Sequence, residues 1–130
     1  MKNLINFNKF SAYAILCFWI ISCNNSTDKA VDYCSLVTNL DKEVQALITD
    51  KSCTSSADCS YIAYGTKACG GPDSYLIYSN KKTDTGELNT KVNEYNSALN
   101  ACRQSGGLSS SDCSVPSVPT PSCVIGLCTN

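Results

Sequence analysis

The most regular feature of the chain is a helical repeat of apolar residues over residues 28–49. Apolar side chains recur there every three or four positions and fall within about a third of the helical circumference, which predicts an amphipathic helix. Ser26 or Thr27 can cap its start. The apolar positions are Tyr33, Leu36, Val37, Leu40, Val44, Leu47 and Ile48.

A second helix is predicted over residues 85–103, where apolar positions alternate steps of four and three residues. Asp84, with Glu87 three residues later, resembles a capping box at its start. Gly106 and Gly107 end the segment. Both apolar stripes are expected to pack in one hydrophobic core. The second stripe consists of Leu88, Val92, Tyr95, Leu99 and Cys102.

Between the two helices lies a nearly palindromic segment, SYIAYGTKACGGPDSYLIYS, at residues 60–79. The symmetry predicts an antiparallel hairpin in which paired residue numbers sum to 139, so that like side chains face one another across the strands. Tyr61 would then lie opposite Tyr78, and Tyr64 opposite Tyr75. Residues 65–74 form the predicted loop, and the sequence GGPD within it is typical of a turn.

Alternation along this hairpin predicts two faces, neither of them polar. The more apolar face should pack on the helices, and it carries Ile62, Tyr64, Tyr75 and Ile77. The other face should be partly exposed, and it carries Tyr61, Ala63, Leu76 and Tyr78. Tyrosine suits an exposed face because its ring supplies apolar area while its hydroxyl stays hydrated. Candidate binding residues are therefore Tyr61, Leu76 and Tyr78, with two buried faces as the alternative.

The C-terminal part of the chain changes character after the second helix. Residues 113–123, CSVPSVPTPSC, are stiffened by Pro116, Pro119 and Pro121. Residues 123–128, CVIGLC, are short and partly β-branched, so we expect a last strand pinned at both ends by cysteines. The predicted fold class is α+β, with two amphipathic helices packed on a small antiparallel β-sheet in a disulfide-rich domain.

The first 22 residues have the pattern of an export signal. Lys2 and Lys9 give a positive start, and residues 11–21 form an apolar stretch. That stretch is shorter than the roughly 20 apolar residues that span a bilayer. The predicted organisation is a signal peptide at residues 1–22, a tether at 23–27 and a single domain at 28–130.

The quartet Ile20-Ile21-Ser22-Cys23 resembles the lipobox of bacterial lipoproteins. The resemblance implies that Cys23 becomes the first mature residue, with a diacylglyceryl group on its sulfur and a further acyl chain (palmitate) on its amine. Two or more chains suffice to anchor a protein to a membrane. The implied location is the periplasmic face or the surface of the cell envelope. The alternative is an ordinary cleaved secretory signal, with Cys23 as one more disulfide cysteine.

The number of cysteines fits export. The chain has 10, and removing Cys17 with the signal and Cys23 with the lipid leaves an even set of eight. Such a set in a short exported chain predicts four disulfides, for which about 105 connectivities exist. Cys34 and Cys102 are expected to pair. Cys102 belongs to the apolar stripe of the second predicted helix, and Cys34 lies at the edge of the stripe of the first. The eight are Cys34, Cys53, Cys59, Cys69, Cys102, Cys113, Cys123 and Cys128.

Composition argues against several classes of function. Without the signal the chain has 8 basic and 11 acidic residues, a net charge of −3, so a nucleic-acid partner is not expected. There is no histidine, which excludes Ser-His and Cys-His nucleophile pairs and histidine metal sites. Export favours disulfides over zinc at the cysteines. We therefore assign no catalytic residue, metal or cofactor, and do not expect an enzyme.

Two classes of function remain. The first is a membrane-anchored binding or structural module with an envelope or extracellular protein as partner. The second is an inhibitor of exported hydrolases or proteases that acts through residues 113–123, with Pro116, Pro119 and Pro121 as candidate residues. Prolines and bracketing cysteines lower the entropy lost when a loop is ordered on binding. A rigid connector between two strands is the plainer interpretation of this loop.

The spaced pattern C…C…YG…CGGP…Y..YS, followed by C..GLC, covers residues 53–128 loosely. It resembles uncharacterised cysteine-rich proteins exported by bacteria. The resemblance implies the compartment and a disulfide-stapled fold, and it brings no activity with it.

Overall fold

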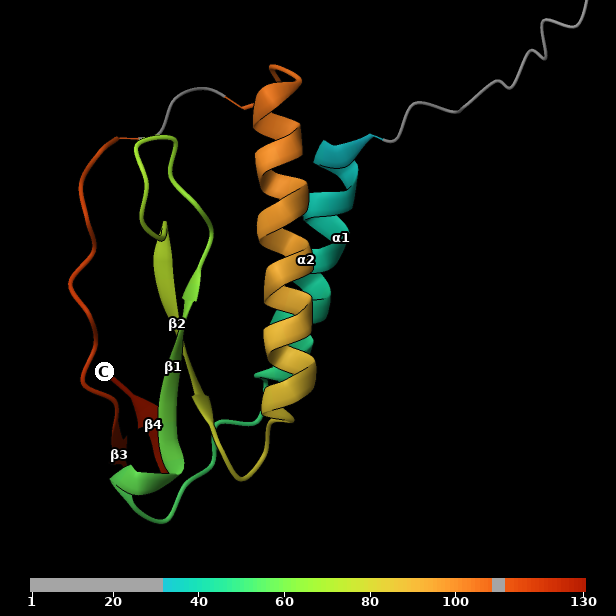
Figure 1. Ribbon diagram of the computed structural model, residues 1–130. Helices are drawn as coiled ribbons and strands as arrows, with labels where there is room; N and C mark the ends of the chain where they lie inside the picture. The colour runs from blue at the N-terminus through green and yellow to red at the C-terminus, as the bar shows by residue number, and fades with distance from the viewer. Residues whose placement is uncertain (1–31, 109–111) are drawn as a thin grey trace, which may run out of the picture. The chain divides into compact units, whose positions relative to one another are not determined.

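In the computed structural model, which describes residues 32–108 and 112–130, two helices lie on one side of a two-stranded hairpin (Figure 1). Helices α1 (Tyr33–Leu47) and α2 (Thr85–Gln104) run antiparallel, and the hairpin consists of β1 (Cys59–Tyr64) and β2 (Ser74–Ser79). A short 3-10 helix, η1 (Ser56–Asp58), precedes β1. A second small hairpin, β3 (Ser122–Val124) and β4 (Leu127–Thr129), lies on the side away from the helices. The α+β fold with helices on small antiparallel sheets is thereby confirmed.

Helix α1 begins where a carboxylate caps it. One oxygen of Asp32 accepts hydrogen bonds from two backbone N–H groups of the first turn, at 3.1 and 3.3 Å. A negative charge at this end also interacts favourably with the helix dipole. The first predicted helix is confirmed, but it is shorter than the range 28–49, because it begins at Tyr33 after the cap Asp32 and ends at Leu47. The predicted caps Ser26 and Thr27 lie outside the described residues.

Helix α2 begins at the predicted cap. The Asp84 carboxylate accepts hydrogen bonds from the backbone N–H groups of Gly86 (2.9 Å) and Glu87 (3.0 Å). The helix ends one residue later than predicted, and Gly106 follows with φ of +80°, a conformation that glycine adopts without steric cost. Neither helix combines the length and apolar character needed to cross a membrane, as far as the described residues go.

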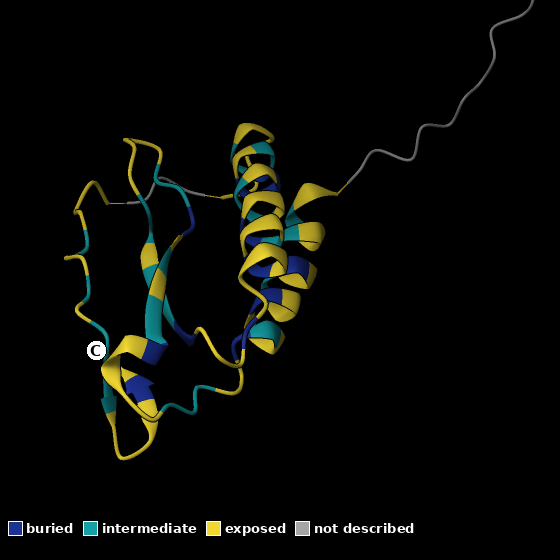
Figure 2. Ribbon diagram, turned by 60° about the horizontal axis from the view of Figure 1, so that its bottom comes forward, coloured by how far each residue is buried: buried dark blue, intermediate teal, exposed yellow. Residues whose placement is uncertain are grey.

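The hydrophobic core lies between the helices and the inner face of the β1–β2 hairpin (Figure 2). Tyr64 shows how a polar side-chain atom is accommodated in this core. Its ring stacks on Tyr95 at a centroid distance of 4.3 Å, and its hydroxyl donates a hydrogen bond to Asp41 Oδ1 at 2.6 Å. Burial, and then this hydrogen bond, raise the pKa of Tyr64 far above its ordinary value. The buried residues of the core are Val44, Ile48, Tyr64, Tyr78, Leu88 and Val92.

The hairpin forms as predicted, but its predicted register is wrong by one residue. Paired residues sum to 138, so that Tyr61 lies opposite Ile77 and Ala63 opposite Tyr75. A slip of one residue turns every side chain of one strand to the other face. The inner face therefore combines Ile62 and Tyr64 of β1 with Leu76 and Tyr78 of β2, and the outer face carries Tyr61, Ala63, Tyr75 and Ile77.

The last strand predicted over residues 123–128 is also corrected, because the segment is a hairpin. Cys123 lies opposite Cys128, and the chain turns at Ile125 (φ +52°) and Gly126 (φ +75°). Two successive residues with positive φ are the geometry of a type I′ turn, which matches the twist of antiparallel strands.

Four disulfides link the eight predicted cysteines, which confirms their number. Cys34–Cys102 was the one pairing expected from the helix seams, and it joins the start of α1 to the end of α2. The other three bridges are Cys53–Cys123, Cys59–Cys128 and Cys69–Cys113.

Candidate binding surface

Three segments form what we call the outer layer, on the side of the β1–β2 hairpin opposite the helices. They are the outer face of the hairpin, the strap (residues 112–121) and the β3–β4 hairpin. The strap runs alongside the hairpin and leads into β3 (Figure 1). The three bridges other than Cys34–Cys102 all have a cysteine in the strap or in the β3–β4 hairpin.

Tyrosines mark the outer face of the β1–β2 hairpin. Tyr61 is 41% exposed, and its ring meets that of Tyr75 edge to face, at a centroid distance of 5.5 Å and an angle of 85°. The prediction of an exposed side chain thus holds for Tyr61. It is wrong for Tyr78, which is 5% exposed, and for Leu76, which packs against the core from the inner face.

The strap is fastened where it begins. The Cys69–Cys113 disulfide ties it to the loop between β1 and β2. In the same loop, Lys67 donates hydrogen bonds from Nζ to Asp112 (2.8 Å) and to the backbone carbonyl of Ser114. The hydrogen bond from Lys67, and after it the one from the Ser114 hydroxyl, lower the pKa of Asp112 below its ordinary value. The Lys67 side chain is 8% exposed, so it acts as an internal latch rather than a surface charge.

Within the strap, the prolines and the valines differ in how far they are exposed to solvent. Pro116, Pro119 and Pro121 are half-buried, whereas Val115 is 74% exposed and Val118 is 58% exposed. The candidate residues predicted from the sequence were the prolines, whereas the side chains that face outward are the valines. The available signal was their spacing of three residues, which matches the repeat of an extended polyproline-type chain.

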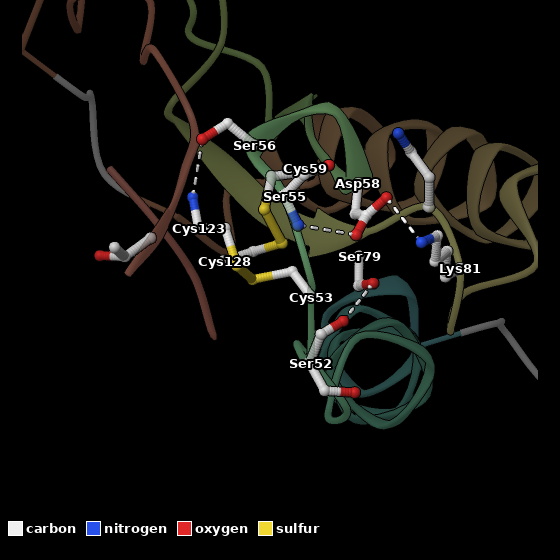
Figure 3. The surroundings of a disulfide bond; sticks show 12 residues. Ser52, Cys53, Ser55, Ser56, Asp58, Cys59, Ser79, Lys81, Cys123 and Cys128 are labelled. Atoms are coloured by element: carbon white, nitrogen blue, oxygen red, sulfur yellow. Dashed lines mark hydrogen bonds and ion pairs between the residues drawn. A yellow bond between two sulfur atoms is a disulfide. The ribbon is translucent and has the colours of Figure 1, made fainter. Parts of the chain in front are cut away.

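Two neighbouring disulfides fasten the other end of the outer layer (Figure 3). The sulfur atoms of Cys53, Cys59 and Cys128 lie within 4.8 Å of one another. Each of them is bonded within Cys53–Cys123 or Cys59–Cys128, so none is a thiolate of the kind that binds a metal. The cluster therefore braces the β3–β4 hairpin against the start of β1.

Beside these disulfides lies the buried carboxylate of Asp58, which is 7% exposed (Figure 3). It accepts hydrogen bonds from the backbone N–H groups of Thr54 (2.8 Å) and Ser55 (3.0 Å), and pairs with Lys81 Nζ at 3.0 Å. The hydrogen bonds from Thr54 are the main cause that holds the pKa of Asp58 well below its ordinary value. This carboxylate orders the turn that delivers Cys59 to its bridge.

Asp58→Asn should lower the melting temperature at neutral pH, because an amide oxygen accepts these hydrogen bonds more weakly and the pairing with Lys81 is lost. A carboxyl with a lowered folded pKa stabilises the fold above its unfolded pKa of about 3.9, and this stabilisation is lost as pH falls below that value. The difference in melting temperature between the variant and the wild-type chain should therefore be smaller at pH 3 than at pH 7. Glu94→Gln, which removes an exposed carboxylate, is the control. An equal gap at both pH values would contradict this role for Asp58.

Large apolar side chains that remain exposed are concentrated in the outer layer. Among the described residues there are nine of them, and six belong to this layer. Two of the other three, Tyr33 and Leu36, lie on α1, and Leu108 follows α2. The six are Tyr61, Val115, Val118, Val124, Ile125 and Leu127.

Cys23, the predicted lipidation site, lies outside the described residues. No family model matches this chain, and no curated protein or solved structure is significantly similar to it, so the outer layer has to be interpreted from its own residues.

Proposed function

We propose that this protein is a lipoprotein of the bacterial cell envelope, anchored through Cys23, whose outer layer binds another envelope or extracellular protein without catalysis. The observation that carries the proposal is the concentration of exposed apolar side chains, six of nine, on a layer braced by three disulfides. A surface that is already rigid loses little entropy on binding, and this raises affinity.

Two features support an exported location. Four disulfides suit an oxidising compartment and are rare in the cytosol of most organisms. The lipobox-like quartet that ends at Cys23 supplies the route to that compartment and the anchor. Within the outer layer, Tyr61 and the strap valines offer apolar contact with little charge, the composition found at the centre of protein–protein interfaces.

Cys23→Ala should abolish lipid labelling and shift the protein from the membrane fraction to the soluble fraction, because no acyl chain could be attached at this position. The measurement is metabolic labelling with a radioactive fatty acid, followed by fractionation of expressing cells. Cys17→Ala is the matched control and should change neither result. A Cys23→Ala protein that stays labelled and partitions into detergent like the wild-type chain would overturn the lipoprotein proposal.

The binding proposal is tested with the oxidised chain from residue 24 onward as bait in envelope extracts. Tyr61→Ser and Val118→Ser should each reduce the amount of partner captured, because each removes apolar contact area from the outer layer. Leu108→Ser is a matched control, because Leu108 is 44% exposed but lies outside this layer. If all three variants capture as much protein as the wild-type bait does, the outer layer is not the binding surface.

A second candidate function is inhibition of exported hydrolases through residues 113–123. It is favoured by the strap itself, which is fastened by disulfides at both ends and turns Val115 and Val118 outward. A target with a pocket for small aliphatic side chains would then lose activity in the presence of the wild-type chain. Val118→Asp should abolish that inhibition, while Tyr61→Ser should not affect it.

A further inference from the structure

The tip of the β3–β4 hairpin carries the most exposed large apolar residue among the described residues. Ile125 is 97% exposed, and its neighbours Val124 and Leu127 are 49% and 56% exposed. Ile125 also has φ of +52°, a backbone conformation that is a genuine outlier for a β-branched residue. Both its exposure and its backbone conformation are unfavourable, and backbone outliers of this kind are typical of functional sites.

The tip is held rigidly from below. Cys123 and Cys128 on either side of it are both in disulfides. The backbone N–H of Cys53 donates to the carbonyl of Gly126 at 2.9 Å, and the N–H of Cys128 donates to the carbonyl of Lys51 at 2.8 Å. The three aliphatic side chains therefore form a fixed apolar knob, which we call the tip.

The same chain has an apolar groove between its two helices. The groove has a volume of about 560 Å³ and is lined on α1 by Tyr33, Leu36 and Leu40. The α2 side of the groove is lined by Ala98 and by four polar or charged residues, Thr90, Asn93, Glu94 and Ser97. Tyr33 and Leu36 belong to the apolar stripe of α1 but remain 42% and 38% exposed, so this part of the stripe has no apolar cover within the described residues.

The tip and the groove lie at opposite ends of the described unit. The groove follows the first half of α1, whereas the tip is bonded to residues 51–53, which come after the end of that helix. A helix of this length measures about 22 Å, so the tip cannot reach the groove of its own chain. An apolar projection and an apolar groove at different places on one chain can form a heterologous contact, in which the two copies use different surfaces.

We propose that the tip of one copy of this chain seats in the α1–α2 groove of a second copy. Charge at the two sites favours this pairing. Lys91 pairs with both Glu43 (2.8 Å) and Glu94 (3.1 Å) beside the groove, which leaves one carboxylate in excess there. The backbone carbonyl of Lys51 is bonded to the N–H of Cys128, so a cationic residue is part of the segment that supports the tip. The tip is part of the outer layer, but the contact does not use Tyr61 or the strap, so variants at Tyr61 and Val118 test the binding of another protein separately.

The test is sedimentation velocity of the oxidised chain from residue 24 onward, which contains the whole compact unit Val31–Asn130 and its four disulfides. The wild-type chain should associate as its concentration rises. Ile125→Asn should weaken association by roughly tenfold or more, the factor expected when one large aliphatic side chain is no longer buried. Asparagine tolerates positive φ, so this variant should fold normally. Leu36→Lys should weaken association equally.

Mixing the two variants distinguishes this contact from any other arrangement. The Ile125→Asn chain keeps an intact groove and the Leu36→Lys chain keeps an intact tip, so an equimolar mixture should form a mixed dimer that neither forms alone. Val118→Asn and Tyr61→Ser, in the outer layer but outside the tip, should associate like the wild-type chain. A monomeric wild-type chain at all concentrations, association unaffected by Leu36→Lys, or a mixture that stays monomeric would each overturn the proposal.

Discussion

Tyr78→Ser should destabilise the protein strongly, whereas Tyr61→Ser should leave its melting temperature nearly unchanged. Tyr78 is 5% exposed and lies in the core with Tyr64 and Leu88, so its removal leaves a cavity against both helices. Replacing a buried aromatic ring by a small side chain costs about 3–5 kcal/mol. For a domain of this size, each kcal/mol lowers the melting temperature by roughly 4–8 °C.

Tyr61 is the matched control, since it is the same residue type on the same hairpin but faces away from the helices. Its substitution should cost only the edge-to-face contact with Tyr75, on the order of 1 kcal/mol. Thermal melts of the two variants, followed by circular dichroism at equal concentration, make the comparison. Equal losses from both would show that the outer face is as tightly packed as the inner face and would contradict the register described above.

That register shows where local sequence symmetry fails. The near-palindrome favours Tyr61 opposite Tyr78, which would place Leu76 and Tyr78 outside and Tyr75 and Ile77 against the helices. The observed pairing is extended beyond the strands by the hydrogen bond from the Asn80 N–H to the Asp58 carbonyl, at 2.8 Å. With this pairing, Leu76 and Tyr78 of β2 lie on the same face as Ile62 and Tyr64 and pack in the core. Neither this packing nor the hydrogen bond of Asn80 is contained in the local symmetry of the sequence.

The helices were predictable because their determinants are local. Asp84 caps α2 through groups two and three residues away, and the buried positions Leu88, Val92 and Leu99 follow the helical repeat. Cys102 lies on the same seam, which is why its pairing with Cys34 could be expected. The other three bridges join segments that sequence alone does not place, and their connectivity required the structure.

The candidate surface was predicted only in part for a related reason. Tyr61 was identified because alternation along β1 was assigned correctly, but Leu76 and Tyr78 were misplaced together with the register. The tip was missed because isoleucine is a poor residue for a turn with positive φ, so the segment around Ile125 has the composition of a strand. Gly126 was the one turn signal in it.

Removing the Cys59–Cys128 disulfide by Cys59→Ala with Cys128→Ala should destabilise the protein and loosen the β3–β4 hairpin selectively. The bridge closes a loop with a sequence separation of 69, and removing a native disulfide from a small exported domain typically costs about 2–5 kcal/mol. Cys128 is 4% exposed, so its substitution also removes packing contacts at the base of the outer layer. This loss in the folded state adds to the loss of the constraint that the disulfide places on the unfolded chain.

The matched control is the double variant Cys34→Ala with Cys102→Ala, because that bridge has almost the same sequence separation, 68. The unfolded-state contributions of the two bridges are therefore similar, and what differs is the part of the fold that each one holds. Hydrogen exchange should show lost protection at the amides of positions 53 and 128 only in the first variant, since these amides make the hydrogen bonds between residues 126–128 and residues 51–53. In the second variant the loss should appear instead where α1 begins and α2 ends. If the first variant keeps protection at positions 53 and 128, the outer layer is held by its hydrogen bonds and by Cys53–Cys123, and its rigidity does not depend on Cys59–Cys128.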